Sequence, residues 1–305
     1  MEREAAERLL GVVADDRKRE LFDVVEVAHD WPELVRLDVR AALPDEHLVR
    51  SDRVPVAVDG HGNAPDRLDD LVRWTGVTEA LTDMIERPDF IHALMRRLTD
   101  FLLSRNEQLE RLGLLTESNT KSRIGSGAAG YTSELPASCD CAADTGAPAG
   151  FRRQRDQWGG ATAQIFSSVS PEMHNEFALS YEKEIMARCG LNYYGCCEPL
   201  HDKMERLATV PRLRKLSISP WCDTRLAAER ATRRYVFSHK PSPAIMADES
   251  FDAARAEADL RARLRDSGEM PCEIILKDIS TVRGDVRRLV DWCRLAHSLC
   301  LERAQ

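Results

Sequence analysis

The second half of the chain alternates short apolar runs with longer amphipathic segments, and this alternation limits the folds that it can adopt. Polar residues end every apolar run, and no two runs are joined by a short hairpin turn. Strands that are connected through helices lie parallel in one sheet, so the pattern predicts an α/β fold. The apolar runs lie at residues 192–196, 213–219, 235–238 and 272–276.

The first half carries weaker strand signals. Residues 54–58 predict a strand because they are short, rich in valine and followed by a glycine-containing loop. A weaker strand is expected at 123–129, either a strand or a helix at 161–168, and a short strand or a helical turn at 22–27. We expect residues 1–50 to be a helical N-terminal segment and residues 51–305 to be the main domain.

The segments between these runs carry signals that predict helices. Gly76 interrupts the helix expected at 66–86, and Pro88 starts the next one, as proline often does in a first helical turn. Ser170 is the expected N-cap of a later helix, because its hydroxyl can accept a hydrogen bond from a backbone amide in the first turn. The later helices are expected at 88–112, 170–188, 251–267 and 286–301.

Composition narrows the class of protein. A formal net charge of -8 argues against a nucleic-acid partner, which calls for a basic patch. No run approaches the roughly 18 apolar residues of a membrane span, and residues 1–10 lack an apolar signal core, so we expect a cytoplasmic protein without a membrane partner. Nine scattered cysteines indicate free thiols, with one or two metal ligands among them, rather than a disulfide scaffold.

The loop after residues 192–196 concentrates reactive groups. Cys196, Cys197 and Glu198 follow directly, and ligands gather at the carboxyl ends of parallel strands. Thiolates and a carboxylate are ligands that zinc accepts, with one position left open for a substrate. Neighbouring side chains on a strand point in opposite directions, so both thiols bind one ion only if the chain turns, as Gly195 and Pro199 allow. The alternative is one buried cysteine and one that lines a pocket.

Other strand ends supply further candidates. Lys240 and Lys277 both follow predicted strands, and two cations facing one pocket would suit an anionic substrate. The alternative for Lys277 is an ordinary ion pair with Asp278. Trp221 would stack on a flat ligand or be a buried aromatic at the rim. Three more candidate substrate-binding residues at strand ends and loops are His61, Tyr131 and Glu134.

A longer stretch carries a family resemblance. The run DQWGGATAQIFSSVSPEMHNEFALSYEKEI, residues 156–185, resembles the uroporphyrinogen decarboxylase superfamily. The downstream pieces YYGCCEPL, RKLSISPWCD, YVFSHKPSPA and EIILKDIST are similar to a bacterial branch of it that is related to corrinoid methyltransferases. The resemblance covers about residues 54–296. It implies a TIM-type (β/α) barrel, shortened at the N-terminus, which is open or is closed by residues 22–27 as a substitute strand.

The chain departs from the family at several positions. The substrate-binding arginine and the catalytic aspartate of the decarboxylases have no clear match. The zinc-dependent methyltransferases use a His-x-Cys pair and a late cysteine. Cys196 matches the cysteine of that pair, but Tyr194 stands at the histidine position, and no late cysteine follows Lys277.

The resemblance implies an enzyme that moves a methyl group between a corrinoid and a thiol or similar acceptor. Cys196, Glu198, Lys277 and Asp278 would be catalytic, and Tyr194 would bind substrate. Zinc would be held by Cys196, Cys197 and Glu198. The corrinoid would be a co-substrate, delivered free or on a corrinoid protein. Two alternatives stay open: decarboxylation of a tetrapyrrole polycarboxylate, and a non-catalytic barrel that binds a ligand. Homodimer formation is also left open.

Overall fold

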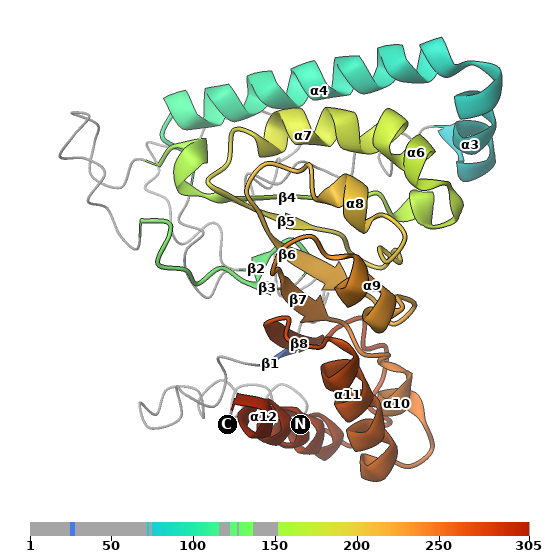
Figure 1. The fold of residues 1–305 in the computed structure, drawn as a ribbon, viewed down its shortest axis with the longest axis vertical. Coiled ribbons are helices and arrows are strands. Elements are labelled where there is room, and N and C mark those ends of the chain that lie inside the picture. Colours follow the sequence, from blue (N-terminus) through green and yellow to red (C-terminus); the bar gives the residue numbers. More distant parts are fainter. Residues whose placement is uncertain are drawn as a thin grey trace.

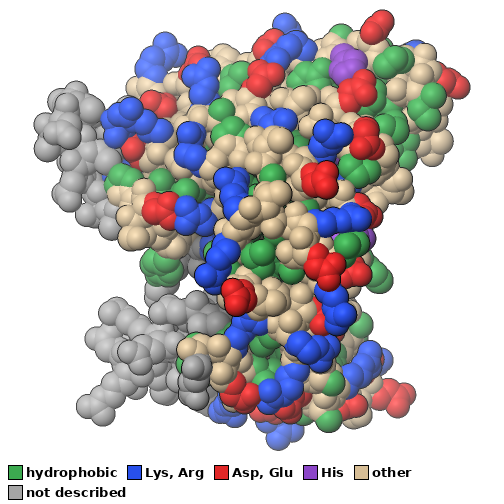
Figure 2. Space-filling model, viewed as in Figure 1, with side chains coloured by type: hydrophobic (Ala, Val, Ile, Leu, Met, Phe, Trp, Pro, Cys, Tyr) green, Lys and Arg blue, Asp and Glu red, His purple; other side chains and the backbone are tan. Residues whose placement is uncertain are grey.

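The computed structural model describes residues 25–27, 72, 75–115, 123–126, 128–136 and 152–304. Three predicted features lie outside these residues: the strand at 54–58, the candidate ligand His61 and, apart from 25–27, the helical segment at 1–50. Within the described part, no helix has both the length and the apolar character that are needed to cross a membrane. On the face shown in Figure 2, the basic and acidic side chains of the described residues are interspersed.

A parallel sheet of six strands runs through the described residues in the order β1-β8-β7-β6-β5-β4 (Figure 1). This confirms the α/β class and the four strands expected in the second half. It also confirms a strand within residues 22–27, beside β8. The strands are β1 Val25–Val27, β4 Trp158–Ala161, β5 Leu191–Tyr194, β6 Leu213–Ile218, β7 Val236–His239 and β8 Cys272–Leu276.

The helices confirm most of the predicted boundaries. Gly76, at a positive φ of 93°, precedes α3, and Pro88 is the first residue of α4. The Ser170 hydroxyl accepts from the Met173 amide at the start of α6, and a π-helical turn joins α6 to α7. The helices are α3 Val77–Glu86, α4 Pro88–Arg111, α6 Pro171–His174, α7 Ser180–Met186, α8 Met204–Leu207, α9 Thr224–Arg230, α10 Ala244–Ala247, α11 Ala253–Asp266 and α12 Arg287–Ala304.

Two predicted segments differ from the structure. Residues 123–129 do not form one strand; they form a small antiparallel hairpin of β2 (Arg123–Ile124) and β3 (Ala128–Ala129). Gly125 allows the reversal because it takes a positive φ of 58°. Residues 161–168, expected as either a strand or a helix, include only the last residue of strand β4 and continue into a 3-10 turn at Gln164–Ser168.

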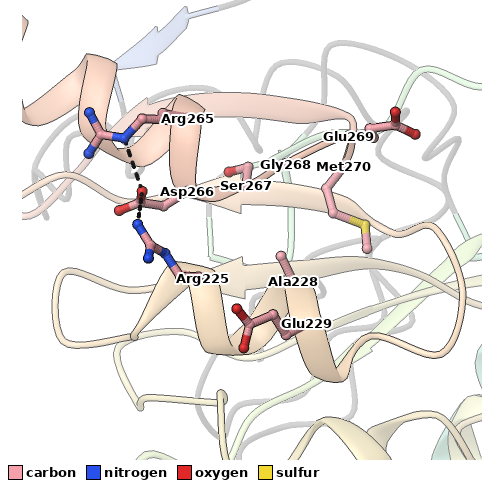
Figure 3. Close-up of a pocket in the computed structure, with 9 residues that line it drawn as sticks. All are labelled: Arg225, Ala228, Glu229, Arg265, Asp266, Ser267, Gly268, Glu269 and Met270. Atoms are coloured by element: carbon pink, nitrogen blue, oxygen red, sulfur yellow. Dashed lines mark hydrogen bonds and ion pairs between the residues drawn. The ribbon is translucent and has the colours of Figure 1, made fainter.

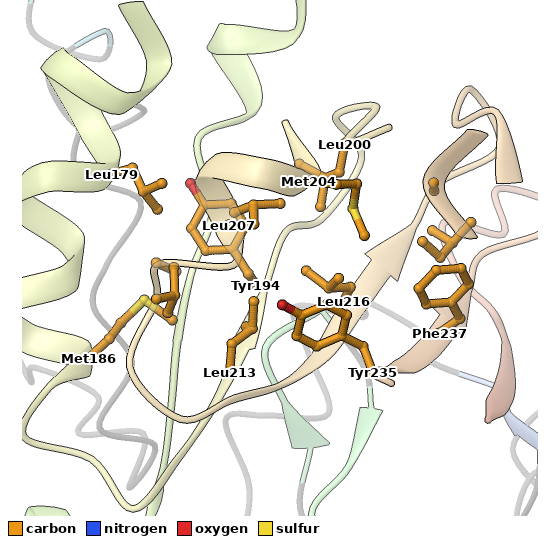
Figure 4. Packing of buried hydrophobic residues seen from close by; sticks show 14 of the residues in the cluster. Leu179, Met186, Tyr194, Leu200, Met204, Leu207, Leu213, Leu216, Tyr235 and Phe237 are labelled. Atoms are coloured by element: carbon orange, nitrogen blue, oxygen red, sulfur yellow. The ribbon is translucent and has the colours of Figure 1, made fainter. Parts of the chain in front are cut away.

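One face of the sheet is covered by helices and holds the largest apolar cluster. Leu216 of β6, Tyr194 of β5 and Phe237 of β7 pack there with Leu207 of α8 (Figure 4). Ile218 of β6 belongs to the same cluster. All five side chains are fully buried. Burying a large apolar side chain stabilises a fold by about 1.5–3 kcal/mol, so this face anchors the strands.

The other face of the sheet carries a smaller apolar cluster under the β2–β3 hairpin. Trp158 of β4, Tyr193 of β5 and Ile275 of β8 meet there with Ile124 of the hairpin. Tyr193 and Tyr194 thus point to opposite faces, as successive strand residues do. We call this second face the hairpin face.

Candidate functional site

The turn after β5 is held rigidly at the carboxyl edge of the sheet. Gly195 takes a positive φ of 98°, and a side chain there would meet Leu200 at 2.7 Å, so the turn requires glycine. The Gly195 amide donates to the Ala161 carbonyl at 2.8 Å. The Cys196 carbonyl accepts from the Ser217 hydroxyl at 2.7 Å. The neighbouring strands β4 and β6 therefore fix the backbone that presents the cysteines.

Two thiols and one ammonium group meet at this turn. The Sγ atoms of Cys196 and Cys197 lie 3.6 Å apart. Lys277, which follows β8, brings its Nζ to 3.5 Å from Cys196 Sγ and 3.4 Å from Cys197 Sγ. Asp278 lies 2.8 Å from the Lys277 ammonium and 3.8 Å from the Cys197 sulfur. Four of the predicted site residues are thus brought together from two distant parts of the chain.

This grouping makes one thiol acidic and the other weakly acidic. A hydrogen bond from Cys196 lowers the pKa of Cys197 to about 6, and the Lys277 ammonium adds to this against the effect of burial. The pKa of Cys196 is raised, because its proton is held by Cys197 and because it is buried. Burial alone would lower the pKa of Lys277, but Asp278 and the two sulfurs raise it, so Lys277 stays charged. The two shifts favour one thiolate and one thiol in the pair at neutral pH, with Cys197 as the more acidic sulfur.

Asp278 holds the lysine in place with an unusual backbone. Its φ of 60° lies in the left-handed region, which aspartate tolerates better than most residues. Its carboxylate is half exposed and paired with Lys277. Such conformations persist where the surrounding structure fixes them, as at functional sites.

Glu198 takes a positioning role in the structure. Its carboxylate is fully buried and accepts from the Thr162 hydroxyl at 2.7 Å and from the Ala163 amide at 3.2 Å. Its other oxygen accepts from the Cys196 amide at 2.9 Å. Glu198 therefore ties the end of β4 to the turn that carries the thiols.

These donors do not fit a zinc ion as they stand. Both carboxylate oxygens of Glu198 are taken by protein donors, which leaves the two thiols as ligands. The Lys277 ammonium contacts both sulfurs, which is where a bound cation would lie. Among the described residues, no three His, Cys, Asp or Glu side chains converge as a metal site.

Replacing Glu198 by glutamine is expected to destabilise the fold. The amide group would face at least one of the protein donors that the carboxylate now satisfies, and it would leave a buried mismatch. We expect a loss of about 2–4 kcal/mol in the free energy of unfolding, measured by urea denaturation. Glu205→Gln, on the exposed side of α8, is the matched control and should change little. Equal stability of the two variants would show that Glu198 does not hold the turn.

Two other candidates are buried and engaged elsewhere. The Tyr194 hydroxyl lies on the helix-covered face, 2.7 Å from His174 Nε2 and 2.7 Å from a Glu182 oxygen. Burial lowers the pKa of His174 to about 3, so this imidazole stays neutral. Lys240 is 1% exposed and donates to the Tyr193 hydroxyl at 2.8 Å and to the Ser238 hydroxyl at 2.6 Å. Lys240 is thus engaged by groups of β5 and β7, whereas Lys277 contacts the two thiols.

The remaining candidates lie on the surface. Glu134 forms an ion pair with Arg214, at the amino end of β6 and so at the opposite edge of the sheet from the thiols. Tyr131 is 52% exposed, and Trp221 is 76% exposed rather than a buried rim aromatic. Within the described part of the chain, none of the three forms a hydrogen bond or an ion pair with Cys196 or Cys197.

The sequence interpretation missed residues that support the turn. The Ser217 hydroxyl, on β6, donates a hydrogen bond to the Cys196 carbonyl, and the Thr162 hydroxyl, on the loop after β4, donates one to Glu198. The hydroxyl of Ser126, in the β2–β3 hairpin, lies 2.9 Å from the Tyr193 hydroxyl. Serine and threonine at strand ends are common, so only their position next to the cysteine loop could have marked them.

A groove of about 460 Å³ lies elsewhere, between α9 and the turn that leads into β8 (Figure 3). Its charges compensate one another, because the Asp266 carboxylate lies 3.5 Å from Arg225 and 3.3 Å from Arg265. It adjoins the amino end of β8, whereas ligands of parallel sheets bind at the carboxyl ends. The cysteine turn is therefore the better candidate.

The chain matches no protein-family model and no curated protein. The resemblance to the uroporphyrinogen decarboxylase superfamily stays a prediction from the motifs.

Proposed function

We propose that this chain is a methyltransferase that moves a methyl group between a corrinoid and a thiol or similar acceptor, with Cys197 as the nucleophile. The observation that carries the proposal is the contact of the Lys277 ammonium with two adjacent thiols at the carboxyl edge of a parallel sheet. A cation beside a thiol favours the thiolate, which is the nucleophilic form.

A barrel, as in the uroporphyrinogen decarboxylase superfamily, is the proposed scaffold. Strands β4 to β8 neighbour one another in chain order and β1 lies beside β8, which is the order of a (β/α) barrel. Two strands separate β8 from β5, a span of about 14 Å along a flat sheet. Lys277 nevertheless contacts Cys196, which supports a strongly curved sheet.

Side chains on the hairpin face support the same curvature. Lys215 of β6 lies 5.6 Å from the ring centre of Trp158 on β4 and 2.9 Å from the carboxylate of Glu273 on β8. Barrel interiors are filled by layers of side chains that come from alternate strands. Trp158, Lys215 and Glu273 come from alternate strands, and Lys215 contacts the other two in the way that the side chains of such a layer do.

The proposed chemistry begins with a displacement at carbon. The Cys197 thiolate attacks the methyl carbon of a methylated corrinoid substrate. The new bond joins sulfur to carbon, and the broken carbon–cobalt bond leaves both of its electrons on the corrinoid. The protein then carries a methyl thioether at Cys197.

An acceptor thiolate completes the transfer. It attacks the same methyl carbon, and the electron pair of the broken sulfur–carbon bond returns to Cys197. A thiol of lowered pKa is the better leaving group, and the Lys277 ammonium stabilises the thiolate that leaves. The residues that favour attack therefore also favour release.

Decarboxylation of a polycarboxylate gains no comparable support. It requires cationic groups that face the ligand, whereas Lys240 is buried and Lys277 is paired with Asp278.

The proposal is tested by incubating the reduced protein with methylcobalamin and mapping its peptides by mass spectrometry. We expect one added methyl group on the peptide that contains Cys196 and Cys197, located at Cys197 by fragmentation. Subsequent addition of an acceptor thiol should remove it. Absence of the methyl group from this peptide under conditions where free thiols are alkylated would contradict the proposal.

A further inference from the structure

The two adjacent thiols can carry a second chemistry, which methyl transfer does not use. Cys196 and Cys197 have sulfur atoms in contact at 3.6 Å, and both are partly exposed. Methyl transfer needs one sulfur, and the second is left beside it. The other described cysteines differ, because burial raises the pKa of each of them. They are Cys189 and Cys222, which are buried, and Cys272, Cys293 and Cys300, which are partly exposed. Among the described cysteines, the adjacent pair therefore has the chemistry of a reactive dithiol.

We propose that Cys196 and Cys197 form a disulfide with each other when the protein meets a hydroperoxide, and that this reversibly removes the nucleophile. The proposal shares the Cys197 thiolate with the proposed function but not its methyl chemistry. It assigns a modification site to the same turn and hydrogen peroxide as the simplest oxidant.

The step balances in atoms and electrons. The Cys197 thiolate attacks one oxygen of hydrogen peroxide, the oxygen–oxygen bond breaks, and the hydroxide that leaves takes up a proton to become water. Cys197 is now a sulfenic acid. The Cys196 sulfur attacks the Cys197 sulfur, loses its proton, and expels the hydroxyl as a second water. Two thiols are oxidised by two electrons in total, and one peroxide is reduced to two waters.

The fixed turn favours the second sulfur over outside partners. The backbone amide of Cys196 donates a hydrogen bond to the Glu198 carboxylate, and the carbonyl of Cys196 accepts one from the Ser217 hydroxyl. These bonds fix the backbone of Cys196, so its sulfur stays beside Cys197. A sulfenic acid with a neighbouring thiol is captured before it is oxidised further. The Lys277 ammonium, in contact with both sulfurs, stabilises whichever one is ionised.

The geometry also makes the bond easy to reduce. Adjacent Cα atoms across a trans peptide are about 3.8 Å apart, whereas most disulfides join Cα atoms about 4.4–6.8 Å apart. The disulfide between neighbours is therefore strained, and strained disulfides have higher reduction potentials. A thiol reductant is expected to restore the dithiol, so the modification behaves as a switch.

Peptide mapping after treatment of the full chain with hydrogen peroxide tests the inference. The expected result is that the peptide with both cysteines loses two hydrogens and regains them with dithiothreitol. In Cys196→Ser, Cys197 should instead remain a sulfenic acid that dimedone traps, whereas Cys222→Ser should behave as the wild-type protein. Circular dichroism reports whether each variant folds, and the wild-type measurement stands without them.

The contrary results are equally specific. Dimedone trapping of wild-type Cys197 to the same extent as in Cys196→Ser, or pairing of either cysteine with another residue, would overturn the inference. The oxidation uses no corrinoid, so its failure would leave methyl transfer untouched. Failure of methyl uptake would in turn leave the disulfide standing.

Discussion

The rate at which the protein takes up methyl groups from methylcobalamin is expected to fall at least about a thousandfold in the Cys197→Ser variant, because removal of a nucleophile eliminates the covalent step. A serine hydroxyl at this position would not ionise near neutral pH, even beside Lys277. The rate is followed by the absorbance change as the corrinoid loses its methyl group. Folding is checked independently by thermal melting.

Two matched variants make this result specific. Cys222→Ser changes a buried thiol on the loop after β6 and should leave the rate unchanged. Cys196→Ser removes the hydrogen bond that lowers the pKa of Cys197, so it should slow uptake at neutral pH without abolishing it. Loss of uptake in Cys196→Ser together with full retention in Cys197→Ser would assign the nucleophile to Cys196 instead.

The Lys277→Met variant is expected to raise the pKa of Cys197 towards the ordinary value of a thiol. The lysine ammonium stabilises the thiolate, so its removal makes ionisation harder and moves the pKa upwards. The hydrogen bond from Cys196 remains in this variant, so the pKa should rise from about 6 but stop short of the ordinary value of about 8.5. Reactivity towards iodoacetamide at pH 7 should therefore fall by less than the about thirtyfold that the full rise would cause, and it should recover at alkaline pH.

Lys277→Arg is the conservative partner of that variant. It keeps the positive charge and should therefore keep most of the low pKa, although the guanidinium cannot reproduce the lysine geometry. If Lys277→Met leaves the pH profile of labelling unchanged, the lysine does not activate Cys197 and the proposed chemistry loses its basis.

The positions of the strands could be predicted where the apolar periodicity is strong. Strands β6 and β8 are rich in Leu and Ile, and their positions follow from that pattern. Strand β4 was harder because its sequence is WGGA, and glycine weakens the strand signal. Glycine is required there: a side chain on Gly159 would meet Asn192 and Cys189 at 2.5 Å, contacts that only the folded chain reveals.

The site could be predicted in position but not in its internal arrangement. The carboxyl ends of parallel strands meet at one edge, which is why Cys196 and Lys277 were expected near one another. Which way each side chain turns depends on partners far away in sequence. Glu198 accepts a hydrogen bond from Thr162, on the loop after β4. Tyr194 faces the helices because successive side chains of a strand point to opposite faces. No local pattern could separate Cys197 from Cys196 as the acidic thiol.

The activation of Cys197 is tested most directly by labelling the wild-type protein with iodoacetamide across a range of pH and quantifying each cysteine-containing peptide. We expect Cys197 to be modified with a midpoint near pH 6, while Cys196 and Cys222 stay unmodified until the solution is alkaline. Labelling of Cys197 with the midpoint of an ordinary thiol, about 8.5, would contradict it, because the Lys277 contact would then not produce a thiolate at neutral pH.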